Sequence, residues 1–433
     1  MLKYLRQLVG GNILLKITSY NAFAMIVKIV SGLVSSKVIA FYLGPPGMAL
    51  LGDLRNFFSS VQSVSTLGIY DGVVKYIAEY KESRKELKKI LSTAFYLGFI
   101  ASILTAIVLY FGASYWNTVI FKDEYDFTYI FQLMALVIPL YAINIFCIAI
   151  INGYSKYKFI IQLNIATNIL GVILTVILIA THDIDGAFVA AVLLPALTLI
   201  ITGVFLVKKK NFIKHIKFAR VKTEYIKRFA SYTGMTIFST MSVPWVYISI
   251  RQHIIDTDGI QNAGYWDAML RLSDYYLMFV TTILTIYILP KLSKLKSARG
   301  FRTEIFNFYK TILPLFGLGL LLIYFLRNII IRLIFTPDFL VMEPIFSWQL
   351  LGDLIRVASV VLGYQFIAKN MFWHFIITQI ISLSVIYSTS VYFIDRFGFV
   401  GASMGHAVSY AFHLSMMLFI FRKELFFKLP QES

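Results

Sequence analysis

Charged residues are scarce in this sequence. Asp, Glu, Lys and Arg make up 14% of its 433 residues, whereas apolar residues make up 58%. A soluble globular domain typically carries about 25% charged residues, so the chain has too few polar residues to cover the surface of soluble domains. The same apolar content suffices for about twelve spans, since each transmembrane helix needs roughly 20 apolar residues. The composition therefore predicts an all-α integral membrane protein.

Cysteine is nearly absent too, because Cys147, inside an apolar run, is the only one. A single cysteine excludes an intrachain disulfide and a Cys/His metal cluster. The six histidines are scattered, and we find no P-loop, no nucleotide-binding glycine motif and no recognisable catalytic triad. We therefore expect no cofactor and no enzymatic activity, and we expect the histidines to be structural or interfacial.

Apolar windows predict twelve transmembrane helices. Barrel strands are excluded, because they alternate in polarity over about ten residues and these windows do not. The first window runs a full span from Ile13 without a small-residue cleavage site, which predicts a helix rather than a signal peptide. The predicted spans are residues 13–41, 48–78, 90–112, 128–152, 159–180, 187–207, 229–250, 263–290, 306–334, 346–367, 373–393 and 399–421.

The net charge of +18 first suggests a nucleic-acid partner, because basic chains bind phosphate backbones. The cations, however, gather in alternate loops, above all in 208–228, as the positive-inside rule describes for cytoplasmic loops. The opposite loops carry mainly carboxylates, with Lys122, Arg251 and Arg396 among their few cations. We therefore predict no nucleic-acid partner, two cytoplasmic termini and an even number of spans.

The two halves of the chain match each other at a shift of about 217 residues. The matching pairs are Phe131-Gln132-Leu133 with Trp348-Gln349-Leu350, Gly186-Ala187 with Gly401-Ala402, and Arg55 with Arg271. These matches predict a six-helix lobe in 1–207, a basic cytoplasmic linker in 208–228 and a second six-helix lobe in 229–433. Because six is even, the lobes form a parallel repeat around a central cavity, as in several transporter folds. The alternative is two unrelated bundles that share these residues by chance.

Several charged residues lie inside the predicted spans, although a charge at the bilayer centre costs about 2.5–3.5 kcal/mol. The cations are Lys28, Arg55, Lys75, Arg271 and Arg356, and the carboxylates are Asp71, Asp267, Asp274 and Asp353. Arginine suits phosphate geometry, so we interpret the cations as candidate ligands of an anionic substrate. The carboxylates are candidates for coupling to an ion or for ion pairs.

The spacing of these charges leaves a structural interpretation open. Asp267, Arg271 and Asp274 stand at i, i+4 and i+7, and Asp353 and Arg356 at i and i+3, so opposite charges on one helix face can pair. Such pairs would hold helices together without binding a substrate. Lys75 can also reach the membrane interface with its long side chain.

Five stretches along the chain carry a family resemblance. They are Lys28-Ile29 with Gly32 and Lys37, Leu43-Gly44-Pro45 with Gly47, the run from Gly68 to Tyr76, Leu289-Pro290, and Trp348-Gln349-Leu350-Leu351-Gly352-Asp353. In order and register, the chain resembles the Wzx-type polysaccharide flippases of O-antigen or enterobacterial common antigen. They share a superfamily with the MATE drug exporters and the lipid II flippase.

The resemblance implies two six-helix lobes around a cationic cavity in the bacterial inner membrane. It implies a lipopolysaccharide-type substrate, an undecaprenyl-pyrophosphate-linked oligosaccharide, flipped from the cytoplasmic to the periplasmic leaflet. Lys28, Arg55 and Lys75 fall in family-like stretches and would bind the pyrophosphate or acidic sugars, whereas Asp267 and Arg271 depart from the expected pattern. H+ or Na+ would be the coupling ion, and a polysaccharide polymerase and a chain-length regulator would be partners.

Two other functions stay open. A MATE-like antiporter exports cationic drugs, and its site should be rich in carboxylates rather than Lys and Arg. A membrane polymerase or glycosyltransferase generally needs a large extramembrane loop with catalytic residues. The longest loop here, 208–228, contains a single acid, Glu224, which disfavours an enzyme.

Overall fold

The structure, a computed structural model, describes residues 13–80, 83–207, 221, 223–295 and 297–427, and these contain helices but no strand. A helix satisfies every backbone hydrogen bond within one segment, which the hydrocarbon of a membrane requires. Eight of the described helices are long and apolar enough to cross a membrane. The prediction of a helical, multi-pass membrane protein is therefore confirmed. The helices are α2 (Ile13–Thr66), α3 (Ile69–Tyr80), α4 (Arg84–Phe111), α5 (Ala113–Phe121), η1 (Lys122–Glu124), α6 (Thr128–Gly153), α7 (Tyr157–Val207), α8 (Thr223–Asp258), α9 (Ile260–Ile283), the π-helical η4 (Leu284–Ile288), α10 (Leu289–Lys294), α11 (Ala298–Phe325), α12 (Arg327–Ile334), η5 (Pro337–Met342), α13 (Ile345–Ala368), α14 (Phe372–Phe397), α15 (Val400–Ile420) and α16 (Arg422–Phe426).

The two longest helices are each broken at one point. In α2 the break is at Gly44, whose φ of 61° lies in the left-handed region, and Pro45 and Pro46 follow it. Proline lacks the N–H that an uninterrupted helix needs. In α7 the break is at His182 and Asp183, where Asp183 has a φ of 47°. Both breaks fall between spans that the sequence predicts as separate.

A third break was not predicted. The sequence predicts one span over 48–78, but α2 ends at Thr66 and α3 begins at Ile69. Leu67 and Gly68 between them have φ values of 52° and 57°. The turn escapes a hydropathy search because both of its residues are apolar, so the apolar window continues across it.

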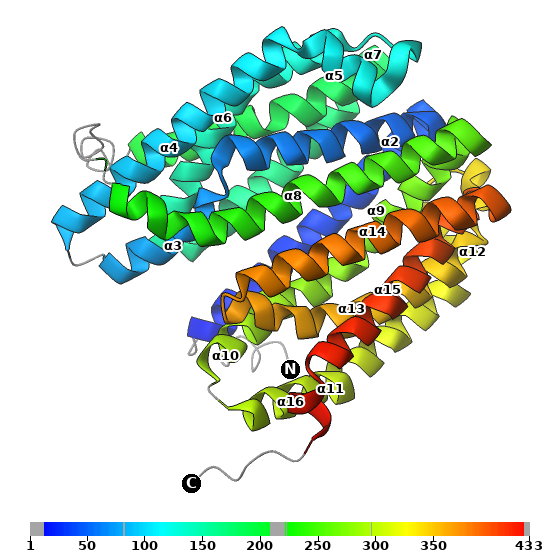
Figure 1. Ribbon diagram of the computed structural model, residues 1–433. Coiled ribbons are helices and arrows are strands. Elements are labelled where there is room, and N and C mark those ends of the chain that lie inside the picture. Colours follow the sequence, from blue (N-terminus) through cyan, green and yellow to red (C-terminus); the bar gives the residue numbers. More distant parts are fainter. Residues whose placement is uncertain (1–12, 81–82, 208–220, 222, 296, 428–433) are drawn as a thin grey trace, which may run out of the picture. The chain divides into compact units, whose positions relative to one another are not determined.

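The chain forms two compact units. The first contains the described residues of Met1–Tyr42 and Asp53–Pro244, and the second those of Leu43–Gly52 and Trp245–Ser433. Helices α2 and α8 therefore each contribute to both units (Figure 1).

The core of the first unit lies among α3, α4 and α6. Ile77 and Ile90 are fully buried there, with Ala149 from α6 beside them. The start of α8 joins this core through Tyr225, whose hydroxyl donates a hydrogen bond to Glu86 of α4.

The second unit is built mainly from α9 and α13–α15, and α15 packs against both α13 and α14 (Figure 1). Its core includes Ala49, Ile254 and Trp266. The segment 43–52 reaches this core through a close approach of two backbones. An added Cβ on Gly264 of α9 would overlap the backbone of Pro45.

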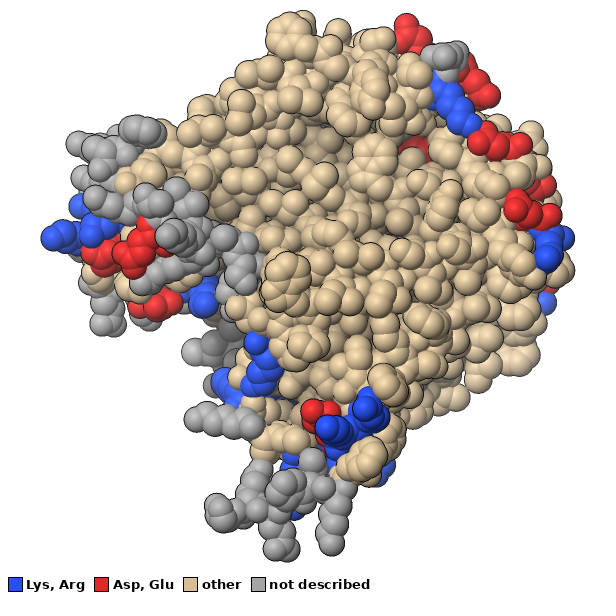
Figure 2. Space-filling view, in the orientation of Figure 1, with Lys and Arg blue, Asp and Glu red and all other residues tan. Residues whose placement is uncertain are grey.

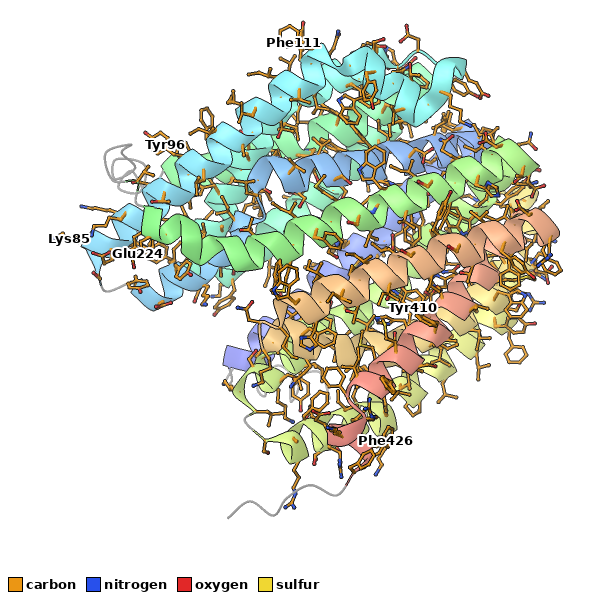
Figure 3. The ribbon with its side chains drawn as sticks, viewed as in Figure 1. Lys85, Tyr96, Phe111, Glu224, Tyr410 and Phe426 are labelled. Carbon is orange, nitrogen blue, oxygen red and sulfur yellow. The ribbon has the colours of Figure 1, made fainter. Side chains whose placement is uncertain are left out.

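The surface is mostly apolar. On the face shown in Figure 2, charged side chains gather toward the edges, and the broad area between them carries almost none. Along α4, Lys85 lies near one end and the exposed Phe111 at the other (Figure 3). This distribution is typical of a surface that faces hydrocarbon between two polar interfaces.

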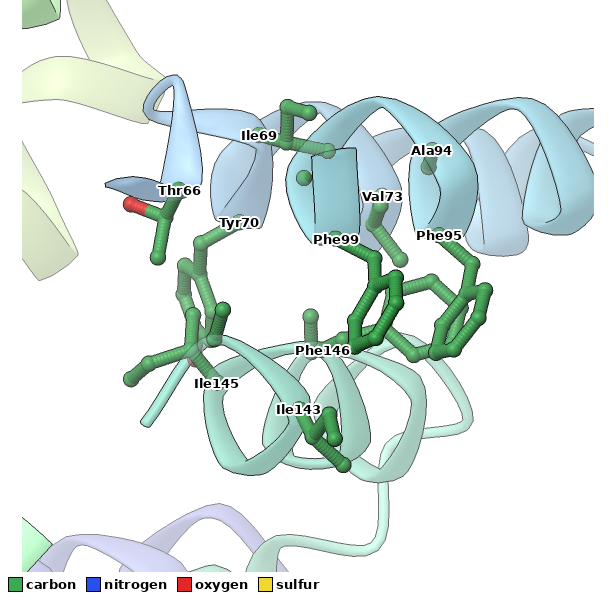
Figure 4. A pocket seen from close by; sticks show the side chains of 13 residues that line it. Thr66, Ile69, Tyr70, Val73, Ala94, Phe95, Phe99, Ile143, Ile145 and Phe146 are labelled. Carbon is green, nitrogen blue, oxygen red and sulfur yellow. The ribbon is translucent and has the colours of Figure 1, made fainter. Parts of the chain in front are cut away.

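A small cavity lies inside the first unit, among α3, α4 and α6. Its volume is about 20 Å³, and apolar and aromatic side chains such as Phe95, Phe99 and Phe146 line it (Figure 4). Space of this size holds one water at most, and the described lining contains no charged side chain. The cavity therefore suits neither a sugar nor a phosphate.

Substitutions at two glycines in helix interiors test the close approach of α9 to Pro45. We expect Gly264→Ala to lower the free energy of unfolding by about 1–3 kcal/mol, because the new methyl group meets immobile backbone at Pro45. Gly98→Ala in α4 is the matched control. Its Cβ would meet only Ile69 Cδ1, at 3.8 Å, so helix propensity should raise stability by up to about 1 kcal/mol. Thermal unfolding of the purified protein in detergent measures both, and equal shifts for the two variants would contradict the packing described here.

Candidate functional site

The predicted site residues of the first unit are accessible cations. Lys28 and Arg55 of α2 and Lys75 of α3 are all exposed. The Lys75 Nζ lies 5.5 Å from the centroid of the Tyr76 ring. The side chain of Asp71 lies outside the described residues, and so does most of the predicted linker 208–228.

Two of the predicted carboxylates of the second unit, Asp267 and Asp353, are each the centre of a buried group. The first group centres on Asp267 of α9. Its Oδ1 is 2.8 Å from Arg251 Nη2, and its Oδ2 is 2.9 Å from Arg271 Nε. The three side chains are only 1–5% exposed. The i, i+4 pair expected between Asp267 and Arg271 is thus present, within a triad of two arginines and one carboxylate.

The position of Arg251 corrects one sequence-based prediction. The sequence placed it in an extramembrane loop after a span ending at 250, but α8 continues to Asp258 and buries Arg251. The physical reason is that no glycine or proline occurs between residue 250 and Gly259, which has a φ of 89°. That glycine is the signal that could have located the helix end, since glycine commonly follows the last helical residue.

The triad ties α8 and α9 to the segment 43–52. The guanidinium of Arg251 lies 5.6 Å from the centroid of the Trp266 ring, and an added Cβ on Gly52 would overlap the side chains of Asp267 and Arg251. The triad therefore joins α8 and α9 beside this segment through one carboxylate that both arginines contact.

The second buried group centres on Asp353 of α13, which is fully buried. Its Oδ2 accepts hydrogen bonds from Tyr276 Oη at 2.6 Å and from Gln349 Nε2 at 3.3 Å. Its Oδ1 lies 3.0 Å from His406 Nε2. Helices α9, α13 and α15 thus each contribute a partner, and we call these four residues the Asp353 network.

A glycine allows the closest of these approaches. An added Cβ on Gly352 would overlap the His406 ring, so α13 and α15 can approach here only because residue 352 lacks a side chain. Ser403 Oγ donates to Gln349 Oε1 at 3.0 Å, and Ser273 Oγ lies 2.7 Å from Tyr276 Oη. These outer contacts fix the orientation of the groups that face the carboxylate.

Arg356 lies at the accessible edge of the Asp353 network. Its Nη1 is 3.9 Å from Asp353 Oδ1, and its side chain is 34% exposed. The guanidinium stands 5.5 Å from the centroid of the Tyr410 ring (Figure 3 labels Tyr410). Asp274, the last predicted carboxylate, is exposed on α9. Arg356 therefore combines a buried counter-ion with an open side, the arrangement that an anion-binding arginine needs.

The structure thus brings Asp267 together with Arg271, and Asp353 with Arg356. Lys28, Arg55 and Lys75 belong to the other unit. Sequence reasoning missed Tyr276, Gln349 and His406. A single uncharged polar residue in an apolar helix can be satisfied by any one hydrogen-bond partner, so its presence does not reveal that the partner is Asp353. In the described part of the chain, no group of three or more His, Cys, Asp or Glu residues is placed to hold a metal ion.

The triad generates a stability prediction. Asp267→Asn leaves two buried arginines without their carboxylate, so the free energy of unfolding should fall by about 3–5 kcal/mol. Glu343→Gln is the control, because it breaks an ion pair with Arg327 whose side chains are 24% and 37% exposed. The control should change stability by about 1 kcal/mol or less. Thermal unfolding in detergent compares them, and a similar loss in both variants would mean that the triad does not support the fold.

The chain is similar in sequence to one described protein family and to two lipid III flippases. Residues 14–296 match the family described as polysaccharide biosynthesis protein. The chain is 26% identical over 419 residues to the lipid III flippase of Escherichia coli (strain K12), with 94% of this chain and 98% of the relative covered. The lipid III flippase of Shigella flexneri matches to the same extent.

Solved structures show the same fold. An inward-facing MATE family multidrug resistance transporter of the MOP superfamily matches with a TM-score of 0.78 at 12% identity, over 92% of this chain and 98% of that one. The lipid II flippase MurJ in an inward closed conformation matches with a TM-score of 0.65 at 17% identity, over 95% and 88%. These structural likenesses show a shared fold. Since the family match covers well over half of its residues, the chain belongs to the polysaccharide biosynthesis protein family.

Proposed function

We propose that this protein is a flippase that moves an undecaprenyl-pyrophosphate-linked oligosaccharide from the cytoplasmic to the periplasmic leaflet of the bacterial inner membrane. The observation that carries the proposal is the end-to-end match to lipid III flippases, which covers 94% of this chain and 98% of the relative. The fold shared with MurJ supports the same class of function.

The proposed topology has twelve crossings with both termini in the cytoplasm. Eight described helices qualify by length and apolarity. The breaks at Gly44 and Asp183 divide two of these into separate segments, and α8 and α15 are long helices outside that set. Counting each segment and both extra helices gives the even number that the charge distribution of the loops requires.

The proposed mechanism is alternating access between two six-helix lobes. A hydrated sugar-diphosphate cannot cross about 30 Å of hydrocarbon unaided. A central cavity would shelter the head group while the polyprenyl tail remains in lipid, and it would open first to the cytoplasm and then to the periplasm.

The cations take different parts in this proposal. Lys28, Arg55 and Lys75 are exposed on the first unit, and Arg356 is partly exposed on the second, so these four are available to the anionic head group. Arg271 is 5% exposed and bonded to Asp267. In the conformation described, it therefore stabilises the helix pair instead of contacting substrate.

Coupling to H+ or Na+ is also proposed. Intramembrane carboxylates can act as proton relays, and Asp71, Asp274 and Asp353 are the candidates. Asp353 is favoured because it is fully buried and bonded to groups from three helices. We further propose that a polysaccharide polymerase and a chain-length regulator act with the flippase, and that the chain itself has no enzymatic activity.

One alternative is supported by a specific observation. The TM-score to the MATE transporter, 0.78, exceeds the 0.65 to MurJ, which favours a MATE-like exporter. At 12% identity, however, this likeness concerns the fold alone. Drug resistance on overexpression, without any effect on surface polysaccharide, would favour the exporter.

Deletion of the gene tests the function in cells. We expect lipid-linked oligosaccharide to accumulate on the cytoplasmic side, and wild-type protein to clear it. Arg55→Ala should reduce clearance at least about tenfold, the effect of losing roughly 1.4 kcal/mol of binding. Arg396→Ala is the control, because Arg396 stands 3.7 Å from the centroid of the Tyr392 ring at the end of α14. Full rescue by Arg55→Ala would overturn its assignment, and loss of polysaccharide without accumulation would indicate a role in synthesis.

The single cysteine makes the topology directly testable. Cys147 is the only cysteine, so Cys147→Ala provides a cysteine-free background. A cysteine at Asp183 should react with a membrane-impermeant maleimide in intact cells, whereas one at Lys156 should react only after permeabilisation. The reverse pattern would invert the proposed orientation.

A further inference from the structure

The groups around Asp353 can accommodate an additional proton, and His406, which has no role in the proposed ion coupling, is one of them. Gln349 Oε1 accepts from Ser403, so the amide nitrogen of Gln349 is the end that faces Asp353. Tyr276 donates its single proton to Asp353, and Ser273 must then donate to Tyr276.

His406 Nε2 stands between two possible partners. It lies 3.0 Å from Asp353 Oδ1 and 3.4 Å from Gln349 Nε2. With Asp353 ionised, a protonated Nε2 donates to the carboxylate, and an extra proton on Nδ1 makes His406 a cation. With Asp353 as the carboxylic acid, an unprotonated Nε2 accepts from it and Nδ1 carries the proton of the neutral ring. Both arrangements keep the hydrogen bond between the two residues, so the Asp353–His406 pair can hold the extra proton on either residue.

Proton uptake changes the charge beside Arg356. With Asp353 ionised and His406 neutral, the charges of Asp353 and Arg356 cancel at 3.9 Å. After one proton is taken up, the three residues carry one net positive charge. No bond other than those to the proton forms or breaks.

We propose that uptake of one proton by the Asp353–His406 pair strengthens binding of a diphosphate at Arg356. The inference rests on the proposed flippase function and adds His406 as a residue that controls head-group affinity. Arg356 can receive the anion because 34% of its side chain is exposed, whereas the pair itself is buried. An anion near Arg356 would feel the change because unit charges a few ångströms apart in protein interact strongly.

The surrounding groups belong to three helices, α8, α9 and α15. Tyr247 of α8 and Asp274 of α9 lie within electrostatic reach of Arg356. Tyr276 of α9 bonds to Asp353, and Tyr410 of α15 contacts the His406 ring at 4.8 Å between centroids. Asp274 is exposed and thus more strongly screened, so the buried pair is the group whose protonation most directly changes the charge that Arg356 experiences.

Binding of a soluble diphosphate diester to the full-length protein in detergent tests the proposal. UDP-N-acetylglucosamine is a suitable probe, because its diphosphate keeps a fixed charge between about pH 5.5 and about pH 8.5. Wild-type protein should bind it about tenfold more tightly at the acidic end. Asp353→Asn should bind at the basic end with the affinity of the acidic wild type, because loss of the carboxylate leaves the same net charge beside Arg356, and Arg356→Ala should abolish binding.

Two further variants should move the midpoint of the pH profile in opposite directions. Tyr276→Phe removes a donor that favours the ionised carboxylate, so the midpoint should rise. His406→Gln removes one of the two proton acceptors and leaves a carboxylate still bonded to Tyr276 and Gln349, so the midpoint should fall. Glu343→Gln, which alters an ion pair outside the Asp353 network, should leave the profile unchanged. These variants keep the test decisive if Asp353→Asn does not fold.

Several results would overturn the inference. They are no gain of affinity at the basic end in Asp353→Asn, persistent pH-dependent binding in Arg356→Ala, or midpoint shifts opposite to those stated. Affinity independent of pH in the wild type overturns this inference alone. Absence of binding at every pH overturns it and also counts against head-group recognition, and the accumulation assay in cells then decides whether the flippase function survives.

Discussion

Ionised side chains in apolar surroundings must have partners, and this constraint governs the second unit. Asp267 forms ion pairs with two arginines that are almost completely buried, and Asp353 gathers polar groups from three helices. Helices α8, α9, α13 and α15 must be positioned so that these groups meet, since removing one partner of a buried pair is strongly destabilising. The fold of this unit and its candidate chemistry therefore depend on the same few contacts.

Close backbone approaches supply the second constraint. Helix interfaces in membranes favour small residues because they let backbones approach. Gly186 and Gly401, which match in the sequence repeat, show the same feature within their own units. An added Cβ on Gly186 would overlap the Leu178 backbone, and one on Gly401 would overlap the Phe393 backbone. A shared local constraint at corresponding positions supports the proposal of two related lobes.

The sequence was sufficient where periodicity and composition carry the information. Apolar windows located the long helices, and an i, i+4 spacing predicted the pairing of Asp267 with Arg271. It was insufficient where a contact joins distant segments. Arg251 was assigned to a loop because hydropathy falls at its end of the span, although α8 continues past it. Its buried position depends on Asp267, sixteen residues away on another helix. His406 and Gln349 were overlooked for the same reason, since only tertiary packing gives them a shared partner.

The charged residues described above belong to a chain of the polysaccharide biosynthesis protein family. We propose that exposed cations on α2 and α3 and a partly exposed arginine on α13 bind the diphosphate, and that buried carboxylates serve as proton sites. Transport by the purified protein in proteoliposomes, with a lipid-linked oligosaccharide as substrate, tests this claim most directly. The account predicts that the protein makes substrate from the inner leaflet accessible to an external, membrane-impermeant glycosidase, at a rate that protein-free vesicles do not reach. Equal accessibility with and without the protein would contradict it.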